Sequence, residues 1–232
     1  MGVGRPLALV TGASRGIGAA VARCLADSYE LLLGGRDHRA LTELASTLPR
    51  AASWPVELTD FDAVAAATRT IDRLDLLVHS AGVWEPGRIG ETPPETWRHV
   101  FDVNVFAVAE LTRLLLPALR LAGGRIVLIN STAGRRASPA RGAYAASKYA
   151  LRAFGEALQA EESENGVGVA SIYPGRVATD MQRKVRRDER GTFDEGEYLP
   201  PESIARAVLA AAEAPADSQF TEIVVSRTVQ GR

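Results

Sequence analysis

The stretch LALVTGASRGIGAAVARCL, residues 7–25, decides the fold of this chain. An apolar run, LALV, is followed by glycines at positions 12, 16 and 18 and then by apolar residues at helical spacing. This order predicts a buried strand, a glycine-rich turn and a helix. The first turn of such a helix offers free backbone N–H groups and the positive end of its dipole, which favour a bound phosphate. Because the spacing is T-G-x-x-x-G-x-G rather than the common G-x-G-x-x-G, a simple tight turn stays an alternative.

The same stretch also fits G-x-S-x-G, the pattern of a hydrolase nucleophile elbow, with Ser14 as the nucleophile. In α/β-hydrolases an acid and then a histidine follow the serine along the chain. His79 and His99 do follow Ser14, but both lie in the first half of the chain and no histidine comes after them. We therefore favour the phosphate-binding loop over the nucleophile.

Short apolar runs alternate with helical patterns along the rest of the chain. The runs are continuous rather than alternating, which indicates strands buried on both faces. Strands separated by helices need crossover connections, which are right-handed in parallel sheets. We predict an α/β fold in a single domain, residues 1–232: a doubly wound, Rossmann-like parallel sheet of about seven strands with helices on both faces. The predicted strands are residues 7–10, 30–35, 52–56, 74–82, 124–130, 166–175 and 221–226, and the predicted helices are residues 17–26, 37–48, 60–71, 96–121, 142–162 and 201–213.

One stretch does not fit this alternation. Residues 182–200, QRKVRRDERGTFDEGEYLP, are charged, contain glycine and are too long for a simple connector. Long loops of this kind are usually lids or disordered segments. We expect a flexible substrate loop here.

Composition points to a small-molecule partner. The 27 basic and 28 acidic residues give a net charge of −1, which calls for neither nucleic acid nor a membrane. Cys24 is the only cysteine, so no intramolecular disulfide is expected, which fits a reducing cytoplasm. The three histidines lack metal-ligand spacing with Cys24, so no metal is expected. Neither a signal pattern nor an apolar run of the ~20 residues that a membrane span needs is present.

Tyr144 and Lys148 are four residues apart in a helical pattern and so share one face. Free tyrosine has a pKa near ~10, and a neighbouring ammonium favours the phenolate and lowers that pKa. The pair can therefore act as an acid/base unit, although the same spacing is common on ordinary amphipathic helices. Ser131 follows the strand GRIVLIN and is expected at the carboxyl edge of the sheet, where open α/β sheets bind ligands.

Six short motifs occur together in one order and resemble those of the short-chain dehydrogenase/reductase family over nearly the whole chain. They are T-G-A-S-R-G-I-G (11–18), S-A-G (80–82), Asn104 in DVNVF, Ser131 in INSTAG, Y-A-A-S-K (144–148) and P-G-R-V-A-T (174–179).

The resemblance implies a catalytic role for four residues. Tyr144 matches the tyrosine that gives a proton to the carbonyl in reduction and takes one in oxidation. Lys148 matches the lysine that lowers the pKa of that tyrosine and binds the nicotinamide ribose. Ser131 matches the serine that polarises the substrate oxygen, and Asn104 matches the asparagine that holds a water in the proton relay. Hydride then passes directly between the nicotinamide and the substrate carbon.

The resemblance also implies a dinucleotide site. Its predicted residues are Gly12, Ser14, Arg15, Gly16, Ile17, Gly18, Arg36, Leu58, Ala81, Gly82, Tyr144, Lys148, Pro174, Gly175, Val177 and Thr179. Two positions depart from the family. Ser80 replaces an asparagine that braces the sheet, and Glu57 stands where many members have aspartate. His79, beside Ser80, is expected to be a packed residue rather than a base.

The end of the second predicted strand, LLLGGRD, predicts the choice of cofactor. NAD-binding folds place an acid here to hold the ribose 2′-hydroxyl, whereas NADP needs positive charge. Gly35 stands at the position of that acid, and Arg36 follows it. Arg15 can approach the same corner, so two guanidiniums can clamp the 2′-phosphate. Asp37 is expected to cap the next helix instead. NADP is therefore predicted in preference to NAD.

We expect an NADP-dependent oxidoreductase that acts on an alcohol or carbonyl, with Tyr144 as general acid/base. The alternative is a non-catalytic, dinucleotide-binding regulator of the same fold, which would often lack the tyrosine or the lysine. Residues 84–87, 135–141 and those after Thr179 are expected to wall the substrate pocket, where Arg135, Arg136 and Arg141 could meet an acidic substrate. The resemblance also implies a homodimer or homotetramer, with the helices at 96–121 and 142–162 pairing between subunits.

Overall fold

A parallel sheet forms the centre of the molecule in the computed structural model, which describes residues 4–215 and 217–228. Its seven strands lie in the order β3-β2-β1-β4-β5-β6-β7, and every pairing is parallel, as predicted. The strands are β1 (Leu7–Thr11), β2 (Glu30–Gly35), β3 (Ala51–Pro55), β4 (Leu76–His79), β5 (Arg125–Ile129), β6 (Gly168–Pro174) and β7 (Glu222–Val225).

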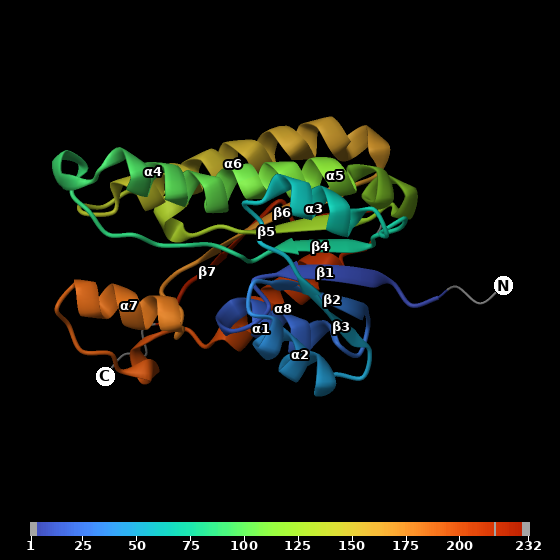
Figure 1. The fold of residues 1–232 in the computed structure, drawn as a ribbon, viewed down its shortest axis with the longest axis horizontal. Coiled ribbons are helices and arrows are strands. Elements are labelled where there is room, and N and C mark those ends of the chain that lie inside the picture. Colours follow the sequence, from blue (N-terminus) through green and yellow to red (C-terminus); the bar gives the residue numbers. More distant parts are fainter. Residues whose placement is uncertain (1–3, 216, 229–232) are drawn as a thin grey trace.

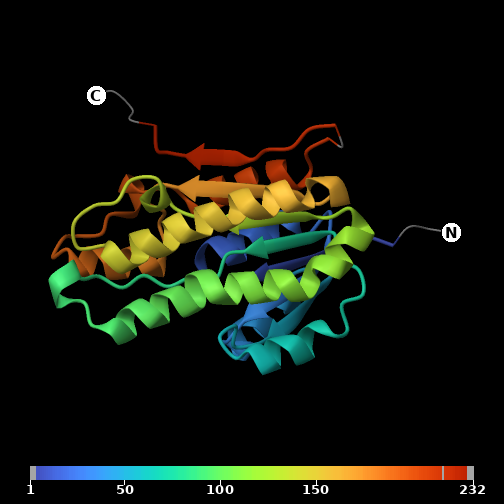
Figure 2. The same ribbon diagram turned by 90° about the horizontal axis from the view of Figure 1, so that it is seen from above.

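Helices cover both faces of this sheet (Figure 1). The helices are α1 (Gly16–Leu25), α2 (His38–Ser46), α3 (Phe61–Thr68), α4 (Pro94–Phe101), α5 (Ala107–Ala122), α6 (Gly142–Glu162), α7 (Asp180–Asp188) and α8 (Pro201–Ala212). Helices α1, α2 and α8 lie on one face and α3 to α6 on the other. Seen from above, α6 and the line formed by α4 and α5 run across the same face (Figure 2). This is the doubly wound α/β fold that the sequence predicts.

The two faces of the sheet have separate hydrophobic cores. Ala8 and Val10 of β1 pack in the core formed with α1, α2 and α8. Leu9, between them, packs in the core on the side of α3 and α5. Successive side chains of a strand point to opposite faces, so a run without polar residues fills both cores at once. The continuous apolar pattern of the sequence has this physical origin.

Strand order reverses between β1 and β4. From β1 the sheet extends through β2 and β3 on one side and through β4 to β7 on the other. The loops after β1 and β4 therefore diverge at the carboxyl edge, which is where such sheets bind ligands. Helix α7 lies beyond the same edge, toward which the strand arrowheads point (Figure 1).

The long helix predicted over residues 96–121 is divided. Helix α4 ends at Phe101, a π-helical turn covers Asp102–Phe106, and α5 begins at Ala107. Such turns are rare and occur frequently at functional sites. Here the turn contains Asn104, whose side chain forms hydrogen bonds with a neighbouring loop, as described below.

We expected residues 182–200 to be irregular throughout, but part of this stretch is helical. Helix α7 occupies Asp180–Asp188, and a short 3-10 turn follows at Glu195–Glu197. Thr179 caps the helix, because its hydroxyl accepts a hydrogen bond from the backbone N–H of Gln182 at 3.3 Å. Whether the segment is mobile stays a prediction. Within the described residues, no helix is long and apolar enough to span a bilayer.

Candidate active site

Tyr144 and Ser131 meet at the carboxyl end of β5. Ser131 follows this strand by two residues, and its hydroxyl accepts a 3.1 Å hydrogen bond from the N–H of Ala133, which fixes the start of a 3-10 turn. Tyr144 lies in the first turn of α6. Burial raises the pKa of the Tyr144 phenol, while a hydrogen bond with Ser131 and the charge of Arg141 act in the opposite direction. Burial has the larger effect, so the pKa of Tyr144 is raised here rather than lowered, contrary to the expectation for a tyrosine beside a lysine.

Lys148 lies one turn further along α6 and is buried. Its ammonium donates a 2.9 Å hydrogen bond to the carbonyl oxygen of Ile129. The same nitrogen is 5.9 Å from the centre of the Tyr144 ring. Burial lowers the pKa of Lys148 to about 8. The lysine is therefore held between the end of β5 and the tyrosine, and it titrates near physiological pH.

Asn104 joins this group from the π-helical turn. Its Oδ1 accepts a 2.9 Å hydrogen bond from the N–H of Val83, and its Nδ2 donates to the carbonyl oxygen of Val83 at 3.0 Å and to Oγ of Ser147 at 3.0 Å. Both amide N–H groups are thus used inside the protein. The side chain fastens the loop after β4 to α6, which is the structural role visible for Asn104.

The glycine turn after β1 is packed against the turn after β4. Gly12 has a φ of +66°, and a Cβ there would lie 2.8 Å from Cα of Ala81. The hydroxyl of Thr11 accepts hydrogen bonds from the N–H groups of Ser80 and Ala81 at 3.0 and 3.1 Å. This threonine therefore braces the ends of β1 and β4 through the backbone.

Helix α1 begins within this turn without a side-chain cap. Arg15 is its N-cap residue, makes no capping hydrogen bond, and is followed by no acidic residue in the first turn. A Cβ at Gly18 would lie 2.2 Å from the carbonyl oxygen of Gly12. The first turn of the helix therefore packs so closely on the glycine turn that no side chain fits at position 18. Uncapped N–H groups of this kind suit a phosphate. Ser14 lies in the turn, and Ile17 lies in the first turn of α1.

Two further close approaches involve the predicted cofactor residues, one between two of them and one with the Tyr144 group. A Cβ at Gly16 would lie 3.3 Å from Cγ2 of Thr179. A Cβ at Gly82 would lie 3.2 Å from Oδ1 of Asn104 and 3.9 Å from Nζ of Lys148. The glycine turn, the turn after β4 and the catalytic candidates therefore form one continuous surface.

The segment from Pro174 to Thr179 borders this surface. The N–H of Gly175 donates to the carbonyl oxygen of Val225 at 2.9 Å, and Val177 forms an isolated bridge with Leu199. These bonds fix the segment between β7 and the residues that follow α7. Four motifs far apart in the sequence thus reach one edge of the sheet.

The far end of the site lies at the carboxyl ends of β2 and β3. Nη1 of Arg36 lies 3.4 Å from Oε2 of Glu57, and both side chains are exposed. Asp37 caps α2, as predicted, because its carboxylate accepts a 3.0 Å hydrogen bond from the N–H of Ala40. A Cβ at Gly35 would make only ordinary contact with Leu41, at 3.7 Å. Leu58 is buried beside this corner.

Two ion-pair groups in and around α7 were not predicted. Nζ of Lys184 lies 2.9 Å from each carboxylate oxygen of Glu85. Glu189 contacts Arg141, Arg176 and Arg186. Many charged residues lie close together in this part of the sequence. Their spacing does not indicate which of them form ion pairs.

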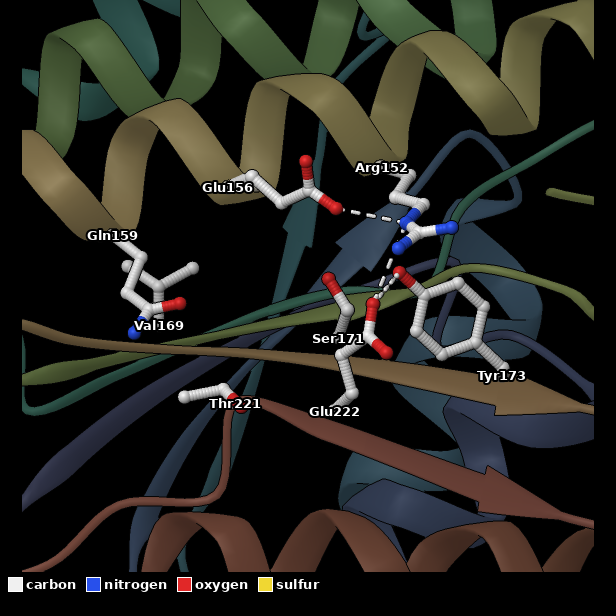
Figure 3. Close-up of a pocket in the computed structure, with 9 residues that line it drawn as sticks. Arg152, Glu156, Gln159, Val169, Ser171, Tyr173, Thr221 and Glu222 are labelled. Carbon is white, nitrogen blue, oxygen red and sulfur yellow. Dashed lines mark hydrogen bonds and ion pairs between the residues drawn. The ribbon is translucent and has the colours of Figure 1, made fainter. Parts of the chain in front are cut away.

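A cavity of about 230 Å³ lies apart from these residues, between α6 and strands β6 and β7 (Figure 3). Its polar side chains pair with one another: Nε of Arg152 is 2.8 Å from Oε1 of Glu156, and Tyr173 donates to Glu222 at 2.9 Å. None of the predicted site residues lines this cavity.

Comparison with known proteins identifies the class of enzyme. Residues 6–190 match the family described as short chain dehydrogenase. The chain is 34% identical to dehydrogenase/reductase SDR family member 7B of Bos taurus, over 88% of this chain and 69% of that protein. It is 32% identical to glycine betaine reductase ATRR of Emericella nidulans, over 94% of this chain but only 18% of that protein. The structure of an alcohol dehydrogenase from the archaeon Thermococcus sibiricus, complexed with 5-hydroxy-NADP, has a TM-score of 0.87 and 28% identity and covers 98% of both chains.

The chain belongs to the short-chain dehydrogenase/reductase family. It is an oxidoreductase of the class that uses a nicotinamide cofactor and acts on CH–OH or C=O groups. Family membership favours the phosphate-binding interpretation of the glycine turn over a hydrolase elbow at Ser14.

Proposed function

We propose that this chain is an NADP-dependent oxidoreductase that uses Tyr144 as its general acid and base. The observation that carries the proposal is the meeting of Tyr144, Ser131 and Lys148 at the sheet edge that also holds the glycine turn. In reduction, the Tyr144 hydroxyl donates its proton to the substrate oxygen, and Ser131 donates a hydrogen bond to the same oxygen. In oxidation, the phenolate takes the proton back. The cofactor, when bound, supplies or accepts the hydride.

Lys148 acts on the tyrosine and on the ribose. Its ammonium has three donors, of which the carbonyl oxygen of Ile129 takes one. The remaining donors are available for the nicotinamide ribose. Positive charge at this position favours the phenolate of Tyr144 and opposes the effect of burial on its pKa. Asn104 holds the loop after β4 against α6 and so keeps this loop in a fixed position relative to Tyr144 and Lys148.

The dinucleotide lies across the glycine turn in this proposal. The uncapped start of α1 would hold its diphosphate, Leu58, Ala81 and Gly82 would hold its adenosine, and the segment from Pro174 to Thr179 would hold its nicotinamide. The close approach of Gly12 and Gly18 to neighbouring backbone supports this placement, because larger residues would close the turn.

NADP is preferred over NAD because Arg36 and Arg15 bind the 2′-phosphate. Arg36 is exposed, and among residues 4–215 and 217–228 its side chain is held only by a 3.4 Å contact with Glu57. Such exposed pairs contribute about 0–1 kcal/mol. The guanidinium is therefore free to exchange this carboxylate for a phosphate. The complex of the Thermococcus sibiricus enzyme with 5-hydroxy-NADP also supports this choice.

Three further properties complete the proposal. The chain acts as one domain with α7 and the following loop as its substrate lid. It works in the cytoplasm, as a homodimer or homotetramer in which the α4–α5 line and α6 pair between subunits. The exposed side chains of Phe106 and Tyr149, which lie on these elements, support such pairing.

The proposal is tested by the consumption of NADPH with a broad panel of aldehydes, ketones, quinones and 3-oxoacyl thioesters. We expect turnover of at least one class, lost in Tyr144→Phe. If NADPH binds but no member of the panel is reduced, and no alcohol is oxidised with NADP, then the chain is a dinucleotide-binding regulator instead.

A further inference from the structure

Three arginines converge on one carboxylate beside the predicted active site. Glu189 accepts two hydrogen bonds from Arg176, at 2.8 and 3.1 Å, one from Arg186 at 2.9 Å and one from Arg141. The three arginines belong to three different segments: the residue before α6, the segment after β6, and α7. Three positive charges against one negative charge leave the group with a surplus of +2.

In this group the acceptor sites of the carboxylate are filled, but many N–H donors of the arginines are not. Four N–H groups already fill the acceptor sites of the Glu189 carboxylate, so it can satisfy no further donor. Arg141 contributes only one of its five guanidinium N–H groups to this carboxylate, and its side chain makes no other hydrogen bond among the described residues. Its side chain as a whole is three-quarters buried, with 25% exposed. Most of its donor capacity is therefore unmatched within the protein.

Arg141 is placed close to the reacting groups. It precedes Tyr144 by three residues, about one helical turn, and its positive charge partly opposes the rise that burial causes in the pKa of the Tyr144 phenol. A bridge between Gly87 and Arg141 fixes its backbone. Ala140, just before it, has a φ of +59°, and Arg190, just after Glu189, has a φ of +55°. Both ends of the ion pair thus carry backbone in the left-handed region, which is unfavourable for these residues and concentrates at ligand clamps.

A second donor without a partner lies on α7. Gln182 is only 7% exposed, and its Nε2 makes no hydrogen bond within the described part of the chain. Gln182 and buried Val185 are three residues apart, so they share the face of α7 that packs inward, and Glu189 follows the helix as its C-cap residue. Glu85, an acid on the opposite wall, is already paired with Lys184. This region therefore offers an unused amide donor and a surplus of positive charge around Glu189.

We infer that the substrate carries an anionic group, a carboxylate or a phosphate, which Arg141 and its neighbouring arginines bind while the carbonyl lies at Tyr144 and Ser131. An anion supplies both acceptors and the negative charge that matches the surplus of the arginines, and guanidinium binds it through paired hydrogen bonds. The inference rests on the proposed function and narrows it to a class of substrate.

The test compares charged ketones with uncharged partners. A homologous series of oxo acids, with the ketone two to five carbons from the carboxylate, is assayed with NADPH against the corresponding methyl esters, and a ketone bearing a phosphate monoester against its dimethyl ester. A charge-assisted contact predicts a kcat/KM at least about ten-fold higher for the anion at the best chain length. Which of the two anions is better identifies the group. Anions that are no better than their esters at every length overturn the inference.

Variants locate the effect. In Arg141→Gln the ratio of anion to ester falls to within about two-fold. Arg187→Gln, an exposed position one residue along α7 from Arg186, keeps the wild-type ratio. If both variants keep that ratio, then Arg141 does not bind the anion.

Calorimetry separates this inference from the proposed function. The same oxo acids and esters are titrated onto wild-type protein saturated with oxidised cofactor, which has no hydride to give. Tighter binding of the acids, without turnover of any ketone by NADPH, supports the anion site and overturns the oxidoreductase mechanism. Turnover of esters and acids alike, with equal binding, supports the mechanism and overturns the anion site.

Discussion

The ammonium of Lys148 lies 5.9 Å from the centre of the Tyr144 ring, one helical turn away and inside the protein. This relationship brings together a base whose pKa is lowered by burial and an acid whose pKa is raised by burial. Each shift disfavours the charged form. Proton transfer needs Tyr144 to be able to form its phenolate. We therefore expect the charged forms of Tyr144 and Lys148 to stabilise each other, with the cofactor also contributing.

The dependence of activity on pH follows from Lys148. Because its pKa is lowered to about 8, the lysine is charged below this pH and loses its proton as the pH rises through it. We expect kcat/KM for carbonyl reduction to be level from about pH 6 to 7 and to fall above pH about 8, since this parameter reports groups of the free enzyme. A steady-state pH profile measures it. A profile that rises through pH 8 to 10 would show that the neutral lysine is the active form.

His79 makes the stability of the protein depend on pH. It is buried at the end of β4, where Nε2 lies 2.9 Å from Oγ1 of Thr112, and burial lowers its pKa to about 3. The unfolded chain binds a proton near pH 6.5 and the folded chain does not, so this contribution is complete above pH 6.5 and is lost as the pH falls toward 3. Between pH 6.5 and 5 the loss is about 2 kcal/mol.

Urea unfolding of His79→Asn and wild type at pH 7 and 5 measures this loss. The difference in the free energy of unfolding between the two pH values should be smaller in His79→Asn by about the same 2 kcal/mol. His38→Asn, at an exposed position, serves as the control and should behave as wild type. Equal pH dependence in all three proteins would mean that His79 is already protonated when folded.

The choice of cofactor depends on Arg36 and on the absence of an acidic side chain at Gly35. Charged hydrogen bonds contribute about 1.5–3 kcal/mol each, so kcat/KM should be at least ~10-fold higher with NADPH than with NADH. Gly35→Asp combined with Arg36→Ala should reverse the order, and the 3.7 Å contact with Leu41 leaves room for the new side chain. Arg39→Ala, exposed on α2, is the matched control. Equal efficiency with both cofactors in the wild type would refute the arginine clamp.

The mobility of α7 depends on its ion pairs. Lys184 binds Glu85, and Glu189 binds three arginines, so these contacts hold the helix on the neighbouring loops. We expect amide exchange in residues 182–200 to be faster than in α5 or α6 and to slow when cofactor and product bind. Glu189→Gln should speed exchange in α7, whereas Asp188→Asn, an exposed neighbour, should not. Strong protection in the free enzyme that cofactor and product leave unchanged would argue against a lid.

The sheet could be predicted from the sequence because its central strands are nearly continuous apolar runs. RIVLI of β5 fills both cores, and no other element of this length needs such a pattern. The positions of Ser131 and the glycines followed from motifs that lie at strand ends, and the end of a parallel strand has a fixed place in this fold. Tyr144 was placed by its helical spacing to Lys148, in the helix that follows β5.

Helix α7 could not be predicted because little of its support is local. Its sequence, DMQRKVRRD, buries only Gln182 and Val185, and its ion pairs reach Glu85, Arg141 and Arg176, far away in the chain. The π-helical turn has a similar cause, since Asn104 is held by Val83 and Ser147. The raised pKa of Tyr144 depends on burial, which spacing in the sequence does not reveal.

Tyr144→Phe tests the central claim most directly, because it removes only the hydroxyl that donates the proton. Tyr29→Phe, at another buried tyrosine before β2, is the matched control. Stopped-flow measurement of a single turnover with bound NADPH follows hydride transfer to the carbonyl in each protein. We predict that Tyr144→Phe binds NADPH as wild type does and transfers hydride at least ~10²-fold more slowly, while Tyr29→Phe reacts at the wild-type rate. A Tyr144→Phe protein that keeps more than about a tenth of the wild-type rate would contradict the assignment of Tyr144 as the general acid.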